Sequence, residues 1–207
     1  MPQLINTLIF DLGGVLIDWN PNYLYEKIIP DPEKRAFFLE NICPSDWNEN
    51  QDAGYPLAQA MADRIELFPE WETEINAFYG RWVEMLGNPI EPTVKILEKA
   101  IKHTDYKVIA LTNWSHETLP LAINLERFQF LKWFDGLVVS GEEKTRKPFL
   151  DFYQIALDRY QIIPEKSIFI DDNLHNIISA KSFNINTIHF NLATDLEAEL
   201  KKFNVIL

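Results

Sequence analysis

Short apolar runs alternate with helical patterns along this 207-residue chain, and this alternation restricts the folds it can adopt. The first run, Ile5–Phe10, ends at Asp11 and the pair Gly13-Gly14, as a buried strand does when it enters a tight turn. From residue 92 onward, the strand and helix patterns predict a parallel sheet with helices on both faces. The other expected strands are Lys107–Leu111, Gly136–Val139, Ser167–Ile170 and Thr187–Phe190, and the expected helices are Glu91–Lys102, Phe149–Tyr160, Leu174–Phe183 and Asp195–Phe203, the last with the capping-box pattern Thr194-Asp195-Leu196-Glu197.

Residues 18–86 break this alternation and contain no good strand pattern. A helix is expected after Asp31, whose carboxylate is a favourable N-cap, and two more are expected over Leu57–Phe68 and Trp71–Leu86. We therefore predict a helical subdomain inserted after the first strand, with most of its aromatic residues in a core and a minority lining a pocket. The expected buried positions are Ala36, Phe37, Leu39–Ile42, Leu57, Met61, Ile65, Phe68, Ile75, Phe78, Tyr79, Trp82 and Leu86.

The composition narrows the classes of function. Hydrophobic residues make up 47% of the chain, enough for a full core, and no apolar stretch is long enough to span a membrane. The first strand leaves no room for a signal peptide, and the lone Cys43, expected to be buried, fits a cytoplasmic location. The net charge is −12, and residues 18–86 hold 14 acidic against 5 basic residues, so neither nucleic acid nor an anionic membrane is an expected partner.

Polar residues follow several of the expected strands. Taken singly, each has an ordinary alternative as a turn residue or part of a solvated loop. Together they supply the nucleophile, hydroxyl, amide, cation and acidic pair that phosphoryl transfer needs, and parallel strands would bring them to one edge of the sheet. These residues are Asp11, Thr112, Asn113, Lys147, Asp171 and Asp172.

Asp171 and Asp172 are the strongest single signal. Adjacent carboxylates after the run Ile168–Ile170 repel each other, and a divalent cation removes that repulsion. Mg²⁺ binds through a few carboxylates and keeps several waters, so it suits this pair. At the first strand, Asp11 would attack phosphorus, and the Gly13-Gly14 backbone would let N–H groups approach the phosphoryl oxygens.

These motifs, in this order, resemble those of the haloacid dehalogenase superfamily of hydrolases, and the resemblance covers essentially the whole chain. It implies a Rossmann-like, three-layer α/β core over residues 1–17 and 87–207, with residues 18–86 as a small α-helical cap of the C1 type. By the resemblance, Asp11 is the nucleophile and a Mg²⁺ ligand, together with the Gly13 carbonyl, Asp172 and Asp171. Thr112 and Lys147 would hold the phosphoryl group, and Asn113 and Gly14 would contact phosphate or substrate.

One position departs from the family pattern. Phosphatases of the family usually carry a second aspartate two residues after the nucleophile, where this chain has Gly13. Loss of a general acid–base group typically costs about 10²–10⁴ in rate. Three explanations remain open: a substrate with a good leaving group (a sugar 1-phosphate, acyl phosphate or aryl phosphate), a substitute such as His116 or Asp18, or a weak enzyme. Asp18 is expected to be a turn acid beside Pro21.

The expected function is Mg²⁺-dependent removal of phosphate from a small phosphomonoester, such as a sugar phosphate. One alternative is a 2-haloacid dehalogenase, whose halide leaving group needs no proton. The pair Asp171-Asp172 argues against it, because dehalogenases of the family carry a hydroxyl residue at the first position and need no metal. A metabolite-binding relic of the fold is the other alternative. The substrate and the oligomeric state are not specified by the sequence.

Overall fold

A five-stranded parallel sheet is at the centre of the computed structural model, which describes residues 4–103 and 105–207. All neighbouring strands in it are parallel, so their carboxyl ends lie along one edge. The chain passes from β1 to one side of the sheet and later crosses to the other side, so the strand order reverses at β1, where open α/β sheets bind ligands. In sheet order the strands are β5 (Gly136–Val139), β4 (Lys107–Thr112), β1 (Thr7–Phe10), β6 (Ser167–Asp171) and β7 (Asn186–His189).

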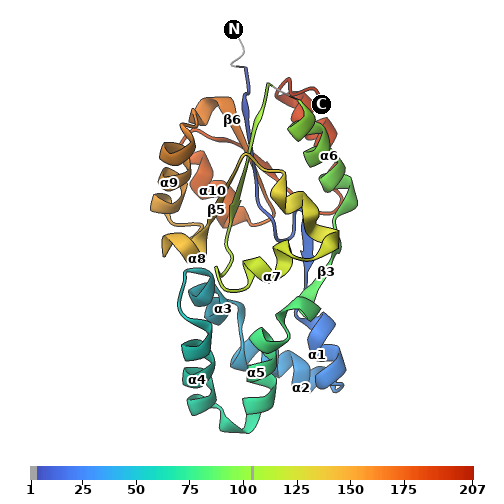
Figure 1. Cartoon of the computed structure of the whole chain (residues 1–207), viewed down its shortest axis with the longest axis vertical. Coiled ribbons are helices and arrows are strands. Elements are labelled where there is room, and N and C mark those ends of the chain that lie inside the picture. The colour runs from blue at the N-terminus through green and yellow to red at the C-terminus, as the bar shows by residue number, and fades with distance from the viewer. Residues whose placement is uncertain (1–3, 104) are drawn as a thin grey trace.

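Helices cover both faces of this sheet, because successive strand side chains point to opposite sides. Ile9 packs in a buried cluster with α9 and α10, whereas Leu8 and Phe10 pack in a second cluster with α6 and α11. The layers are visible in Figure 1. The predicted three-layer α/β fold is therefore confirmed. The helices are α6 (Glu91–Lys102), α7 (Leu119–Ile123), α8 (Ser140–Glu143), α9 (Leu150–Tyr160), α10 (Leu174–Lys181) and α11 (Leu196–Lys202), with 3₁₀ segments at Glu126–Lys132 and Pro164–Lys166.

The stretch between β1 and α6 is mostly helical and lies below the carboxyl edge of the sheet in Figure 1. The chain enters it through β2 (Ile17–Trp19) and leaves it through β3 (Leu86–Pro89), which pair in an antiparallel ribbon. Its helices are α1 (Asn22–Ile28), α2 (Pro32–Phe37), α3 (Ser45–Asp52), α4 (Leu57–Leu67) and α5 (Glu72–Gly80), with a π-helical turn at Phe38–Ile42 and 3₁₀ turns at Pro69–Trp71 and Trp82–Met85.

Several predictions for this stretch are wrong. Strands were not expected here, yet β2 and β3 form: each has only three or four residues, too few to show a strand pattern, and they pair where the two ends of the helical stretch meet. The helix predicted over Trp71–Leu86 ends at Gly80, and the chain then makes a 3₁₀ turn into β3. Two helices were not predicted: α1 has only seven residues, and α3 is too polar to show the apolar period that identifies a helix from sequence.

The first predicted helix of this stretch begins as expected. The Asp31 carboxylate accepts hydrogen bonds from the backbone N–H groups of Glu33 and Lys34, at 2.9 and 3.0 Å. The expected buried face is wrong at Ala36 and Phe37, which are exposed, and right at Ile42, which is buried. The helix continues into a π-helical turn, and Phe38, which was not predicted to be buried, lies in the core with Ile42.

The aromatic residues of this stretch form a packed cluster, as predicted. Phe78 lies at the centre of it, with ring centroids 5.0–6.2 Å from those of Tyr25, Trp47, Tyr79 and Trp82. The cluster is continuous with the core on one face of the sheet. Cys43 is also buried, with 3% of its surface exposed, and it behaves as a small apolar side chain as expected.

Element boundaries in the sheet differ from prediction by a residue or two. β4 and β6 extend one residue further than expected, so Thr112 and Asp171 are the last residues of their strands. At α11 the cap is Asp195, whose carboxylate accepts from the Ala198 N–H, and the Thr194 hydroxyl instead accepts from the Asn191 N–H. The predicted capping box therefore does not form: Asp195 caps the helix alone, because Ala198 at the third helical position has no side chain that could bond back to it.

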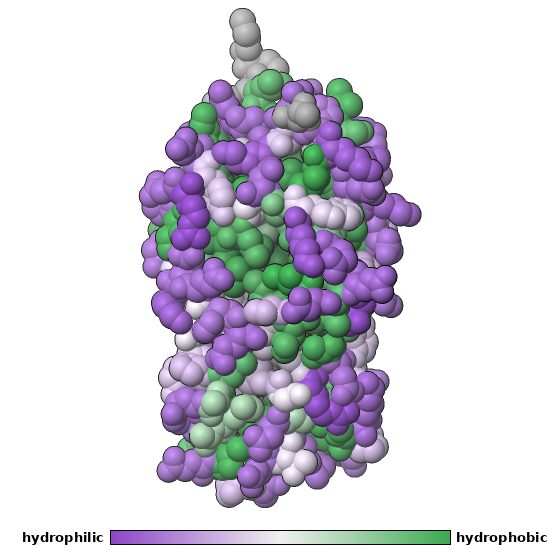
Figure 2. All heavy atoms as spheres, in the orientation of Figure 1, coloured by the Kyte–Doolittle hydropathy of each residue, from purple (hydrophilic) through white to green (hydrophobic). Residues whose placement is uncertain are grey.

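Hydrophilic side chains cover most of the face drawn in Figure 2, with hydrophobic side chains gathered mainly near its middle. Charged residues make up 24% of the chain, consistent with such a surface. Among residues 4–103 and 105–207, the helices include none with the length and hydropathy that crossing a bilayer requires.

Candidate active site

The central strand β1 and its two neighbours bring three polar residues to one edge of the sheet. Asp11 directly follows β1, and its N–H donates to the Ile170 carbonyl at 2.9 Å. Thr112 is the last residue of β4, and Asp171 is the last residue of β6. The three residues are nearly buried, with exposed fractions of 8%, 1% and 0%. The predicted convergence of strand ends is therefore present.

Lys147 joins this group from the loop between α8 and α9. Its Nζ lies 2.8 Å from Oδ1 of Asp11 and 2.7 Å from Oδ2 of Asp171. Burial alone would lower the pKa of Lys147, but the two carboxylates raise it above its ordinary value, so the ammonium group stays charged. A buried lysine between two carboxylates places a fixed positive charge beside the Asp11 oxygen.

Asp11 itself is in an environment that resists ionisation. Burial raises its pKa to about 7, Lys147 opposes that shift, and Asp171 and Asp172 add to it. Burial also raises the pKa of Asp172, with a further contribution from Asp171. Three carboxylates with one lysine leave the site short of positive charge.

The donor set fits a hard divalent cation. One carboxylate oxygen from each of Asp11, Asp171 and Asp172 can be chosen so that all lie within 4.8 Å of one another. Oxygen donors at this spacing suit Mg²⁺, and the ion would relieve the repulsion that raises the carboxylate pKa values. Among the described residues these three acids would hold the ion, and Gly13 lines the neighbouring cavity together with Asp172.

Asp171 is held by contacts that the sequence did not indicate. The Asn176 side chain donates to both of its oxygens, at 3.0 and 3.1 Å, and the Asn173 N–H donates to Oδ1 at 2.8 Å. Asn176 lies in the first turn of α10, three residues after the Asn173 N-cap. That spacing was visible in the sequence, but an asparagine in a helix is too common to be a signal.

The two glycines after Asp11 differ in role. Gly14 has a φ of +70°, and a Cβ built on it would lie 2.2 Å from Oδ2 of Asp172, so the backbone passes directly beside that carboxylate. Its N–H donates to the Ile17 carbonyl at 2.9 Å and is therefore not free to bind a phosphate, contrary to the prediction for the N–H groups of this pair. Gly13 lines the pocket, and a Cβ on it would have no neighbour within 4 Å.

Thr112 and Asn113 make different contacts. The Thr112 hydroxyl is buried without a hydrogen-bond partner among the described residues, as expected of a group that awaits a ligand. The Asn113 side chain accepts from the Lys147 N–H at 2.8 Å and donates to the Lys147 carbonyl at 2.9 Å. Asn113 therefore fixes the backbone of Lys147, although it also borders the pocket.

A cavity of about 200 Å³ lies beside this group, lined by residues that follow Asp11, Thr112 and Asp171 in the chain. Its sheet side is formed by Gly13, Gly14, Asn113 and Asp172. The other walls come from the helical stretch and the loop after β4, through Trp19, Trp82, Trp114, Asn48 and Asp52. The predicted minority of pocket-lining aromatics is thus present. Asn48 and Asp52 were missed because α3 was not predicted, although their i, i+4 spacing would place them on one helix face.

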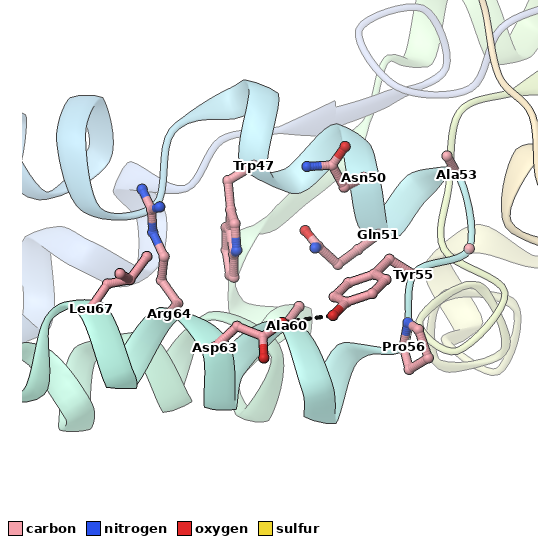
Figure 3. Close-up of a pocket in the computed structure, with 11 residues that line it drawn as sticks. Trp47, Asn50, Gln51, Ala53, Tyr55, Pro56, Ala60, Asp63, Arg64 and Leu67 are labelled. Atoms are coloured by element: carbon pink, nitrogen blue, oxygen red, sulfur yellow. Dashed lines mark hydrogen bonds between the residues drawn. The ribbon is translucent and has the colours of Figure 1, made fainter.

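The larger cavity of about 540 Å³ lies between α3 and α4 and includes none of the strand-end residues. Figure 3 shows Trp47, Asn50 and Gln51 of α3 at this cavity, where the Tyr55 hydroxyl also donates a hydrogen bond to the Asp63 carboxylate. This cavity is on a different side of α3 from Asp52. We therefore place the candidate active site at the smaller cavity.

The two side chains suggested as substitutes at Gly13 do not line the smaller cavity. Asp18 is part of β2, not of a turn, and its carboxylate accepts a hydrogen bond from the Tyr23 hydroxyl. The Nδ1 atom of His116 is buried without a partner among the described residues.

Known proteins resemble this chain in sequence. A sesquiterpene phosphatase of Aspergillus oryzae is 29% identical over 198 residues, which cover 91% of this chain and 92% of that protein. A phosphorylated carbohydrates phosphatase of Thermotoga maritima is 24% identical over 189 residues, covering 89% and 84%.

Solved structures share the fold. A haloacid dehalogenase family enzyme of Bacteroides thetaiotaomicron, solved with magnesium and inorganic phosphate, superposes with a TM-score of 0.71 at 22% identity, covering 94% of this chain and 98% of that one. A predicted hydrolase of this type from Porphyromonas gingivalis gives 0.76 at 17% identity, covering 99% and 100%. The family model for haloacid dehalogenase-like hydrolases matches residues 47–190, more than half of the chain. The chain therefore belongs to the haloacid dehalogenase-like hydrolase family.

Proposed function

We propose that this protein is a Mg²⁺-dependent phosphatase that removes phosphate from a small phosphorylated metabolite. The observation that carries the proposal is the buried Lys147 ammonium within 2.8 Å of Asp11 and 2.7 Å of Asp171, beside a three-carboxylate cluster. A positive charge next to one carboxylate, with oxygen donors for a cation, is the arrangement that nucleophilic attack on a phosphate dianion requires. The phosphatase names of the relatives support the same reaction.

Asp11 is the proposed nucleophile. One of its oxygens attacks phosphorus, the bond to the leaving oxygen breaks, and water then hydrolyses the aspartyl-phosphate. Lys147 stabilises charge on the transferring group and keeps Asp11 oriented. The Thr112 hydroxyl, which has no other described partner, donates to a phosphoryl oxygen. Gly14 admits the substrate close to the backbone, and Asn113 holds Lys147 in place.

Mg²⁺ is the proposed cofactor, with Asp11, Asp172 and the Gly13 carbonyl as ligands. When bound, it supplies positive charge that offsets the charge of the phosphate. The Asp171 oxygens already accept from Lys147, Asn176 and Asn173, so we propose that Asp171 acts on the ion directly or through water.

We further propose that residues 18–86 are a cap over a core made of residues 1–17 and 87–207. The ribbon of β2 and β3 supports these boundaries, because it joins the entry and exit of the helical stretch. Trp19 and Trp82 contribute to the pocket from this stretch, which supports a role in enclosing a small substrate. The small cavity favours a small phosphomonoester.

The test is hydrolysis of p-nitrophenyl phosphate with and without Mg²⁺. We expect turnover that EDTA abolishes and excess Mg²⁺ restores, and we expect Asp11→Asn to lose it. Release of halide from a 2-haloacid in the presence of EDTA would instead identify a dehalogenase. No turnover across a panel of phosphorylated metabolites, with Mg²⁺ bound, would refute the phosphatase proposal.

A further inference from the structure

The pocket holds a second acidic group that the strand-end motifs do not explain. Asp52 is the last residue of α3, and its side chain lines the same cavity of about 200 Å³ as Gly13, Gly14 and Asp172. Gly13 has no side chain to exchange a proton with the leaving group, and the space beside it is open, since a Cβ there meets nothing within 4 Å. An acid that lines the same small cavity is placed to act on the same bound molecule.

Contacts from the core fix Asp52 at this cavity. The Ser140 hydroxyl donates to the Asp52 carbonyl, and a backbone hydrogen bond from Ser115 reaches its carboxylate. One turn earlier, Glu49 forms an ion pair with Arg146 at 2.7 Å, next to Lys147 in the chain. The carboxylate also accepts from the Asn48 amide at 3.0 Å, along the same helix face. α3 is thus held against the loops that carry the proposed catalytic residues.

The surroundings of Asp52 suit proton exchange near neutral pH. Burial raises its pKa to about 7, and nearby Glu49 acts in the same direction. The Ser115 N–H and the charges of Arg146 and Lys147 oppose the shift. Its position at the C-terminus of α3 also disfavours the negative form, because that end of a helix carries a partial negative charge. A group with a pKa near the working pH is an effective general acid and base.

We propose that Asp52 supplies the proton exchange that Gly13 cannot, as the general acid and base of the reaction; this inference rests on the proposed phosphatase function. When Asp11 attacks phosphorus, the P–O bond breaks and its electron pair goes to the leaving oxygen, which takes the proton of the Asp52 carboxyl group. The Asp52 carboxylate then accepts a proton from water as the water oxygen attacks the aspartyl-phosphate. Inorganic phosphate leaves, and both carboxyl groups return to their starting states.

The test compares phenyl phosphate with p-nitrophenyl phosphate, which are similar in shape but differ in leaving-group basicity. In saturating Mg²⁺, Asp52→Asn is expected to lower kcat/KM for phenyl phosphate about 10²-fold or more, and for p-nitrophenyl phosphate much less, because only the more basic leaving oxygen needs a proton. Asp46→Asn is the matched control, since Asp46 is an exposed acid on the same helix. It is expected to leave both values unchanged.

Three further measurements separate catalysis from structure. Wild-type kcat/KM for phenyl phosphate is expected to fall as pH rises above about 7, as Asp52 loses its proton, and Asp52→Asn is expected to lack this decline. Acid quenching should trap more phosphorylated protein in Asp52→Asn, because the water step is slowed as well. The open space at Gly13 permits Gly13→Asp, which is expected to restore phenyl phosphate hydrolysis in the Asp52→Asn background.

The outcomes distinguish the two proposals. If wild type hydrolyses neither aryl phosphate nor any metabolite in Mg²⁺, both fail. If wild type is active and Asp52→Asn, folded by circular dichroism, loses nothing or loses equally on both aryl phosphates, only the role of Asp52 is overturned. If Asp52→Asn does not fold, Asp52→Glu is measured in its place. A ratio of kcat/KM for phenyl phosphate to kcat/KM for p-nitrophenyl phosphate that falls below the wild-type ratio supports the proposal. An equal loss of kcat/KM on both substrates refutes it.

Discussion

At the residue scale, the contact between Lys147 and two carboxylates decides the character of the site. A buried lysine is stable there because Asp11 and Asp171 pair with it, and each carboxylate in turn depends on the lysine. Removing one partner of a buried ion pair typically costs more than the pair contributes, because the remaining charge is left without water or a counter-charge.

We therefore expect Lys147→Met to destabilise the protein by about 3–5 kcal/mol at pH 8 and to abolish phosphatase activity. The deficit should shrink at pH 5, where the facing carboxylates take up protons. Urea unfolding in EDTA at both pH values measures the difference in free energy of unfolding between wild type and Lys147→Met. The exposed Lys132→Met is the control and should lie within about 0.5 kcal/mol of wild type. An unchanged unfolding midpoint in Lys147→Met would show that the pair contributes nothing to stability.

Gly14 gives a second prediction at this scale. In Gly14→Ala the new Cβ would lie 2.2 Å from Oδ2 of Asp172, so the carboxylate must move. The backbone φ of +70° at this position is also unfavourable for alanine. We expect about 10–100-fold weaker Mg²⁺ binding, measured by calorimetry, because the ligand is displaced from its position. Gly80→Ala, which meets nothing within 4 Å, should bind Mg²⁺ as wild type does. Equal affinities in the two variants would exclude Asp172 as a ligand.

At the element scale, short polar interactions define the helices that the core does not fully bury. α2 has no buried residue of its own, and its start depends on the Asp31 carboxylate. Asp31→Ala should therefore lower the free energy of unfolding by about 1 kcal/mol. Asp31→Asn should lower it much less, because an asparagine side chain also caps a helix. Chemical denaturation of the three proteins tests this. Equal losses in the alanine and asparagine variants would contradict a capping role.

At the scale of the whole molecule, the buried acids make stability depend on pH. Burial raises the pKa values of Asp11 and Asp52 from their ordinary 3.8 to about 7. Between pH 3.8 and about 7 the folded state binds more protons than the unfolded state, so the free energy of unfolding falls as pH rises. In EDTA, we expect a lower Tm at pH 8 than at pH 5, with a smaller difference in Asp52→Asn.

Excess Mg²⁺ should reverse this loss at pH 8, because the ion binds the ionised carboxylates of the folded protein and shifts unfolding by mass action. Differential scanning calorimetry at pH 5 and 8, with EDTA or Mg²⁺, measures both effects. A Tm that rises from pH 5 to 8 in EDTA would show that the carboxylates are not held in unfavourable surroundings.

The sequence predicted the parts of the fold that depend on local pattern. The strands β4 to β7 and the helices α6, α9, α10 and α11 were placed within a few residues, because an apolar run or an amphipathic period indicates directly that a segment is buried. The short helices α7 and α8 were not predicted, because four or five residues are too few to show a helical period. The family motifs then predicted that Asp11, Thr112, Lys147 and Asp171 would meet. Parallel strands require that convergence once the sheet order is known.

Tertiary structure alone decided the rest. The ribbon of β2 and β3 forms only when the two ends of the helical stretch come together. The sequence of α3 is too polar to show the apolar period that predicts a helix. Whether Asp52 faces the cavity depends on Ser115, Ser140 and Arg146, which lie far from it in the chain. A local pattern reports whether a segment is buried, but the neighbours that set a carboxyl group's pKa come from other segments, and only the folded chain brings them together.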